Sequence, residues 1–204
     1  MKSLVQRGCG LILAIALGLL AVPNTAAEPV TFKSASPYQL AELIGTARPS
    51  YDLAINADLV SPDVIKNAMP AFVFMHGSGG KLLRHLQYLD VARALGFVTL
   101  QIDSFGSRGV SSTVGNQRNV TAAMMTIDLL RALEFLTSQP NVDPSRIIVM
   151  GSSKGAIAAL YATWSPIRRK VVGAIDYAAY LLLYPLCVAI EDGNVTSNSV
   201  HVFI

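Results

Sequence analysis

Cysteine and histidine are scarce in this chain of 204 residues, which contains two cysteines and three histidines. Cys9 lies in an apolar N-terminal segment, so the rest of the chain holds Cys187 alone, and one cysteine cannot form an internal disulfide. Nowhere do histidine, cysteine and carboxylate residues cluster with the spacing of metal ligands. The sequence therefore predicts no disulfide scaffold, no metal site and no cofactor.

Charge is also sparse, because charged residues make up 14% of the chain and hydrophobic residues 52%. That balance is typical of one well-packed globular domain. The formal net charge of +3 includes Lys2 and Arg7, and it falls to +1 without the first 27 residues, which contain no acidic residue. No basic surface remains that would favour binding to nucleic acid.

The N-terminus lacks an apolar run long enough to cross a bilayer. Lys2 and Arg7 precede an apolar stretch at residues 11–22, and small residues precede a predicted cleavage site after Ala27. A membrane-spanning helix needs about 20 apolar residues, more than this stretch provides. We therefore interpret residues 1–27 as a signal peptide. The protein is expected to be exported, periplasmic or secreted, without a stable membrane anchor.

The remaining chain, residues 28–204, alternates between short apolar runs and helical segments and is expected to form a single domain. Two leading strands are considered in VTFKSA (30–35) and YDLAINADLV (51–60), and five apolar runs predict buried strands at residues 70–75, 97–102, 146–150, 170–177 and 199–204. Hydrophobic residues at helical spacing predict a helix around residues 121–138 that ends before Pro140. This alternation predicts an α/β fold with a mainly parallel sheet and helices on both faces.

The segment VMGSSKG (149–155) places a serine between a predicted strand and a helix-forming stretch. It fits the pattern Gly-X-Ser-X-Gly with Gly151, Ser153 and Gly155. In a nucleophile elbow, a serine on a strained strand-to-helix turn projects its hydroxyl from the sheet edge, and flanking glycines permit close backbone approach. We interpret Ser153 as a nucleophile; a simple turn in which the serine caps the helix is the alternative.

A glycine-rich segment, HGSGG (76–80), follows the strand predicted at residues 70–75. Its backbone N–H groups, with the N–H of Lys154, would form an oxyanion hole, and His76 is interpreted as structural. A phosphate-binding loop does not fit, because Met75 replaces the first glycine that such a loop needs and Leu82 replaces its Ser or Thr.

These segments together resemble the dienelactone hydrolase-like branch of the α/β-hydrolase superfamily, in its exported subgroup. The resemblance covers residues 60–204 and rests on HGSGG, IDSFGSRG (102–109), NQR (116–118), DLLRALEFL with PNVDPSRI (128–147), GSSKG and YPLC (184–187). It implies a serine hydrolase of small-molecule carboxylic esters or lactones. The implied nucleophile is Ser153, and the implied oxyanion donors are the backbone groups of Gly77, Ser78 and Lys154. The better-known members use cysteine as nucleophile, so their dienelactone substrate is not carried over.

The catalytic acid and base are not evident. In α/β-hydrolases they follow the nucleophile, first the acid and then the histidine. The carboxylates after the serine are Asp176, Glu191 and Asp192, and the one histidine, His201, lies within a predicted strand. The resemblance places the acid after the strand at 199–204 and the histidine beyond one more strand. We expect a C-terminally truncated chain, without the last strand and helix, that is inactive alone; His201 as the base is the alternative.

Other residues admit less specific interpretations. For Asp103 and Arg108, a loop-stabilising ion pair is favoured over a role in lining the cleft, and residues 168–170 are interpreted as a solvated helix end. The resemblance implies a disulfide partner for Cys187 in a longer form, whereas here its thiol is expected to be unpaired.

A second class of function also fits, a non-catalytic α/β-hydrolase-fold protein that binds ligands. We favour the hydrolase, because a binding protein would require neither the nucleophile elbow nor the oxyanion segment. Neither the substrate nor the oligomeric state follows from the sequence.

Overall fold

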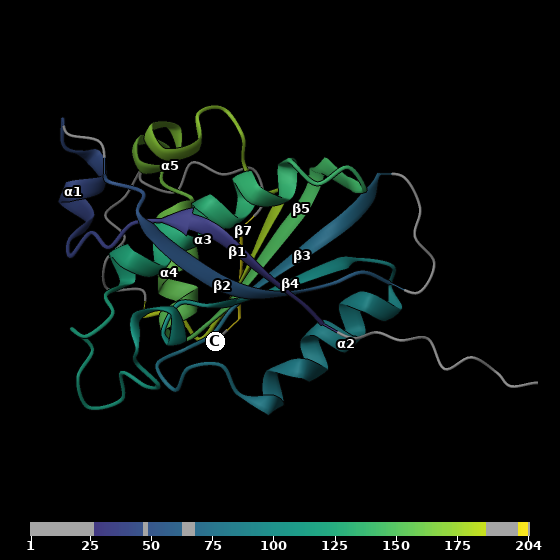
Figure 1. Cartoon of the computed structure of the whole chain (residues 1–204), viewed down its shortest axis with the longest axis horizontal. Helices are drawn as coiled ribbons and strands as arrows, with labels where there is room; N and C mark the ends of the chain where they lie inside the picture. Colours follow the sequence, from purple (N-terminus) through teal and green to yellow (C-terminus); the bar gives the residue numbers. More distant parts are fainter. Residues whose placement is uncertain (1–26, 47–48, 63–67, 187–199, 204) are drawn as a thin grey trace, which may run out of the picture.

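The computed structural model describes residues 27–46, 49–62, 68–186 and 200–203 (Figure 1). The predicted signal peptide up to residue 26, Cys187, Glu191 and Asp192 lie outside these residues. The helices and strands, in chain order, are β1 (Glu28–Ser34), α1 (Leu40–Ile44), β2 (Leu53–Val60), β3 (Met69–Met75), η1 (Leu83–His85), α2 (Leu86–Ala94), β4 (Val98–Asp103), η2 (Gly106–Arg108), α3 (Ala122–Thr137), β5 (Val142–Ser152), α4 (Lys154–Ala162), α5 (Ser165–Val172), β6 (Ala179–Leu183) and β7 (Val200–Phe203).

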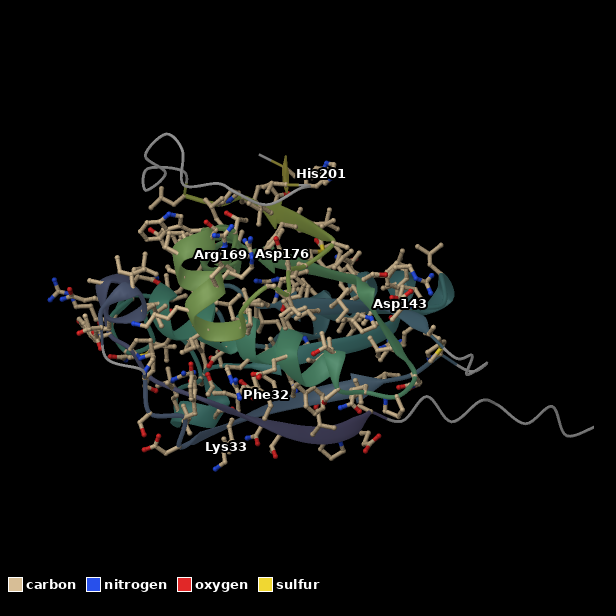
Figure 2. The ribbon with its side chains drawn as sticks, turned by 90° about the horizontal axis from the view of Figure 1, so that it is seen from above. Phe32, Lys33, Asp143, Arg169, Asp176 and His201 are labelled. Carbon is tan, nitrogen blue, oxygen red and sulfur yellow. The ribbon has the colours of Figure 1, made fainter. Side chains whose placement is uncertain are left out.

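The described strands form one mixed sheet in the order β1-β2-β4-β3-β5-β6-β7. Strand β2 pairs antiparallel with both β1 and β4, whereas all pairings from β4 to β7 are parallel. The mainly parallel sheet expected from the sequence is confirmed. Figure 2 shows the two edges of the sheet, with Phe32 and Lys33 of β1 on one side and His201 of β7 on the other.

Helices pack on both faces of the sheet, because successive side chains of a strand point to opposite faces. In β3, Ala71, Val73 and Met75 belong to the larger hydrophobic core, which includes the buried residues of α3 and α4. Phe72 and Phe74 instead belong to a smaller core with Leu89 and Ala92 of α2. Helix α2 therefore lies on the opposite face of the sheet from α3 and α4 (Figure 1).

The prediction of a strand at residues 170–177 is wrong. Residues 165–172 form helix α5, which begins with Pro166 in its first turn and ends at Gly173, where φ is +71°. Strand β6 starts later, at Ala179. The run of β-branched residues at 171–172 favours a strand locally, but it continues an amphipathic helix whose Ile167 is fully buried.

Residues 168–170 do form the end of a helix, as expected, but Arg168 is not solvated. Its side chain is buried and donates to the carbonyl of Thr163 at 2.8 Å, and it lies 3.3 Å from a carboxylate oxygen of Asp176. Asp176 also accepts a hydrogen bond of 2.7 Å from the hydroxyl of Tyr180. Asp176, one of the carboxylates after Ser153, is thus engaged in a cluster that joins α5 to β6.

Candidate active site

Ser153 lies at the turn between β5 and α4, with φ of 52° and ψ of −114°. Such angles are rare for a residue with a side chain and cost free energy. The neighbouring glycines make the turn possible, because a Cβ atom on Gly151 would clash with the backbone of Gly155, and one on Gly155 with the carbonyls of Met75 and His76. The turn leaves Ser153 exposed beyond the end of the strand.

The segment 76–80 packs directly against this turn. A Cβ atom on Gly77 would lie 3.0 Å from the main-chain oxygen of Ser152 and 3.2 Å from Cβ of Ser153. The N–H groups of Gly77 and Ser78 donate to no other described residue, and neither does that of Lys154, the first residue of α4. Helix N-termini carry such unpaired N–H groups. The structure thus brings the predicted nucleophile and the three predicted oxyanion donors together.

His76 is fully buried beneath this segment. Its Nδ1 lies 2.9 Å from the carbonyl oxygen of Gly77, and its ring packs edge-on against Phe105. Burial lowers the pKa of the imidazole, so the ring is neutral at neutral pH, with Nδ1–H donating to the carbonyl. Because a planar peptide fixes its N–H opposite its C=O, this bond also orients the N–H of Ser78. These contacts agree with the interpretation of His76 as structural.

No described histidine forms a hydrogen bond with Ser153, whose hydroxyl has no hydrogen-bond partner among the described residues. His85 of η1 packs against Phe74 on the α2 side of the sheet, and burial lowers its pKa to about 4. His201 pairs with Leu181 in β6, two residues before the position level with Ser152. Strand spacings put the backbones of His201 and Ser152 roughly 12 Å apart.

Arg108 forms an ion pair, but its partner is Asp128 of α3 and not the neighbouring Asp103. The guanidinium lies 2.7 Å from the Asp128 carboxylate, which is fully buried and also accepts hydrogen bonds from the hydroxyls of Ser34 and Ser104. Arg108 further donates to the carbonyl of Ala35 at 2.8 Å. The expected ion pair between Asp103 and Arg108 is therefore wrong. Arg108 stabilises the loop through a carboxylate of α3, whereas the Asp103 carboxylate accepts a hydrogen bond from the N–H of Gly106.

Two cavities lie near these elements. One of about 490 Å³ is lined by Asp103 and Phe105, together with Lys81 and Ser111 beside the glycine-rich segment. Arg108 does not line it. A larger cavity, of about 790 Å³, adjoins α1 and is lined by residues such as Glu42 and Asp52, away from Ser153. Although it is the larger of the two, none of its lining residues belongs to the Ser153 turn or to the segment 76–80.

Sequence reasoning missed the residues around the Lys154 side chain. The ammonium is buried, donates to the main-chain oxygen of Gln117 at 2.8 Å and lies 3.3 Å from Oγ1 of Thr113. Burial lowers the pKa of this ammonium to about 8. The one signal in the sequence was that Gln117 belongs to the NQR segment on which the resemblance rests.

Within the residues that the structure describes, no group of three or more histidine, cysteine or acidic side chains could hold a metal ion. Among the same residues, no helix is long and apolar enough to cross a membrane.

No protein-family model matches the chain. A protein of Bacillus subtilis (strain 168) named as a hydrolase, YtaP, is 30% identical over 136 residues, which are 56% of this chain and 46% of YtaP. Among solved structures, a thermostable esterase from Pseudomonas putida ECU1011 matches with 20% identity and a TM-score of 0.51, over 78% of this chain and 43% of the esterase. A Klebsiella pneumoniae protein described as a dienelactone hydrolase matches with 14% identity and a TM-score of 0.50, over 83% of this chain and 65% of its own.

These similarities, with the strand order, define the class: the chain has the α/β-hydrolase fold. The chain spans about half the length of the curated relative that it matches. Its relatives are named as hydrolases and esterases, and the fold alone does not assign a reaction to this chain.

Proposed function

We propose that this chain is part of a serine hydrolase of carboxylic esters or lactones, similar to the dienelactone hydrolases. Ser153 attacks the carbonyl carbon of the substrate, and the N–H groups of Gly77, Ser78 and Lys154 stabilise the negative charge that develops on the carbonyl oxygen. The names of the similar proteins support the choice of ester chemistry.

One observation carries this proposal, the packing of Gly77 against the strained Ser153 turn. A strand-to-helix turn that served only to connect two elements would gain nothing from a serine at φ of 52°. The exposure of Ser153 next to Gly77, whose N–H has no described acceptor, supports a role in acyl transfer, because that reaction needs a nucleophile beside unpaired N–H groups.

The residues that the structure describes provide no evident proton acceptor for the Ser153 hydroxyl. None of the described histidines or carboxylates forms a hydrogen bond with its hydroxyl. We propose that a longer form of the protein supplies the acid and the histidine from residues that follow β7. Without a base, the serine is a weak nucleophile, and removal of a catalytic histidine lowers kcat on the order of 10⁶-fold.

A fluorophosphonate probe tests the nucleophile in a form that includes any coding sequence after Ile204. The probe is expected to label Ser153 in the wild type and in Ser152→Ala, the matched control on the neighbouring serine. Labelling should disappear in Ser153→Ala. A wild-type protein that is not labelled at Ser153 would favour the alternative, a non-catalytic protein that binds ligands.

Comparison of the two lengths tests the origin of the base. A panel of short-chain esters and lactones should be hydrolysed by the longer form and not measurably by the 204-residue chain. Robust hydrolysis by the 204-residue chain that is lost in His201→Ala would assign the base to His201 and contradict this part of the proposal.

We further propose that the protein is exported after cleavage behind Ala27. Strand β1 begins at Glu28, the first residue of the expected mature chain. Sequencing the N-terminus of protein from its native source tests this. An N-terminus that still begins at Met1 would contradict export by cleavage.

A further inference from the structure

The side chain of Lys154 has no role in the proposed reaction, which uses its backbone N–H. Lys154 as a whole residue is 5% exposed, and the described partners of its ammonium are neutral: the main-chain oxygen of Gln117, the hydroxyl of Thr113 and the ring of Phe105, whose centroid lies 5.8 Å away. A buried ammonium with no carboxylate beside it is costly, and ionisable groups in such settings concentrate at functional sites.

The segment that binds this ammonium also holds Ser78. The carbonyl oxygen of Ser78 accepts hydrogen bonds from the N–H of Thr113 at 2.8 Å and from the hydroxyl of Ser112 at 3.1 Å. The hydroxyl of Ser78 donates to Oε1 of Gln117 at 3.1 Å, an oxygen that also accepts from Thr113. Ser78 is therefore fixed through both its backbone and its side chain to residues 112–117.

Two of the proposed oxyanion donors come from separate parts of the chain. The N–H of Lys154 belongs to the first turn of α4, whereas the N–H of Ser78 belongs to the loop after β3. Lys154 joins them, because its backbone carries one donor and its side chain holds the segment that fixes the other.

We propose that the Lys154 ammonium is a positioning group that sets the placement of Ser78 relative to the nucleophile turn, acting through Gln117 and Thr113. The structural part of this inference stands on the contacts above, and its catalytic consequence rests on the proposed function. Oxyanion donors act through their exact placement, and displacement of a catalytic group by 1 Å can cost about 100-fold in rate.

Amide hydrogen exchange tests the structural part without any need for activity. Lys154→Met keeps the backbone N–H and approximately the length of the side chain, and Lys33→Met, on exposed β1, is the matched control. The Thr113 amide, which donates to Ser78, is expected to exchange about tenfold faster in Lys154→Met, while amides of β3 keep their protection. Unchanged exchange at Thr113 would overturn the inference.

Kinetics of the longer form test the catalytic consequence. Lys154→Met is expected to lower kcat for a short-chain ester about 10- to 100-fold with KM changed less than about twofold, because placement of the donors matters most in the transition state. Lys154→Arg, which keeps the charge, should recover part of the loss, and Lys33→Met should behave as wild type. An unchanged kcat in Lys154→Met would overturn the positioning role.

The hydrogen-exchange and kinetic experiments distinguish a failure of this inference from a failure of the proposed function. A wild-type protein that neither hydrolyses esters nor reacts with fluorophosphonate refutes the proposed function, and the Thr113 amide alone then decides whether Lys154 positions Ser78. A wild type that is active, with a fully active Lys154→Met, refutes the positioning role and leaves the proposed function standing.

Discussion

Gly77 and Ser153 are packed so closely that a methyl group on Gly77 would lie 3.2 Å from Cβ of Ser153. The sheet creates this contact, since β3 and β5 are parallel neighbours, with Met75 level with Gly151. The loops that follow parallel strands emerge at the same edge, where α/β proteins place their ligands. The contact therefore links the glycine-rich loop and the serine turn, which are separate in sequence.

Gly77→Ala tests how much this contact matters. The added methyl group would lie 3.0 Å from the main-chain oxygen of Ser152, so the loop must move by a few tenths of an ångström. We expect ester hydrolysis by the longer form to fall about tenfold in kcat, because two oxyanion donors move with the loop. Gly79→Ala is the control, since its methyl group would meet only the movable Leu82 side chain, and equal activity of the two variants would contradict the prediction.

Arg108→Ala should lower the unfolding free energy far more than a substitution that removes a surface ion pair. The change leaves the fully buried carboxylate of Asp128 without its cation, which typically costs about 3–5 kcal/mol of unfolding free energy. Arg146→Ala, which breaks an exposed pair with Asp143, should cost much less, because solvent screens an exposed pair. Urea denaturation measures both.

A double replacement separates the worth of this pair from the cost of breaking it. Arg108→Met combined with Asp128→Leu removes both charges, so most of the loss seen in Arg108→Ala should be absent. A double variant as unstable as Arg108→Ala would show that the hydrogen bonds matter more than the charges, namely those that Ser34 and Ser104 donate to Asp128 and the one that the Ala35 carbonyl accepts from Arg108.

The parts of the site that could be predicted from sequence are those encoded in short segments. VMGSSKG contains the end of a strand, the turn and the start of a helix, so its local pattern predicts the placement of Ser153. HGSGG likewise follows its strand directly. Parallel pairing of the two strands, expected from the alternation of strands and helices, then brings both segments to one edge.

Long-range contacts of single side chains could not be predicted in this way. Lys154 and Gln117 are 37 residues apart, and Arg108 and Asp128 are 20 apart on different elements. Their pairing depends on how α3 and the loop before it pack, which no local pattern encodes. The prediction of a strand in place of helix α5 failed for a related reason. Burial of Ile167 against the core overrides the strand preference of the β-branched residues at the end of the helix.

The charge of Lys154 predicts a pH-dependent difference in stability. Burial lowers the pKa of its ammonium in the folded protein to about 8 from 10.5, so between these values the unfolded chain binds more protons. The contribution of Lys154 to folding stability must therefore rise with pH in this window. The unfolding free energy of Lys154→Met relative to wild type should decline between pH 8 and pH 10, measured by urea denaturation. Parallel curves for the two proteins would contradict the prediction.

The backbone strain at Ser153 predicts that loss of function can increase stability. A side chain at φ of 52° and ψ of −114° costs about 1–3 kcal/mol, and glycine adopts such angles freely. Glycine also makes the unfolded chain more flexible, which offsets about 0.4–1 kcal/mol of the relieved strain. Ser153→Gly should therefore raise the unfolding free energy by about 1 kcal/mol.

Ser153→Ala is the matched control for this strain. It removes the hydroxyl but keeps Cβ, so it should gain none of this stability, and both variants should lose fluorophosphonate labelling in the longer form. Urea denaturation of the three proteins measures the difference. If Ser153→Gly were no more stable than Ser153→Ala, the turn would not be strained, and the protein would not be maintaining this conformation for the sake of the hydroxyl.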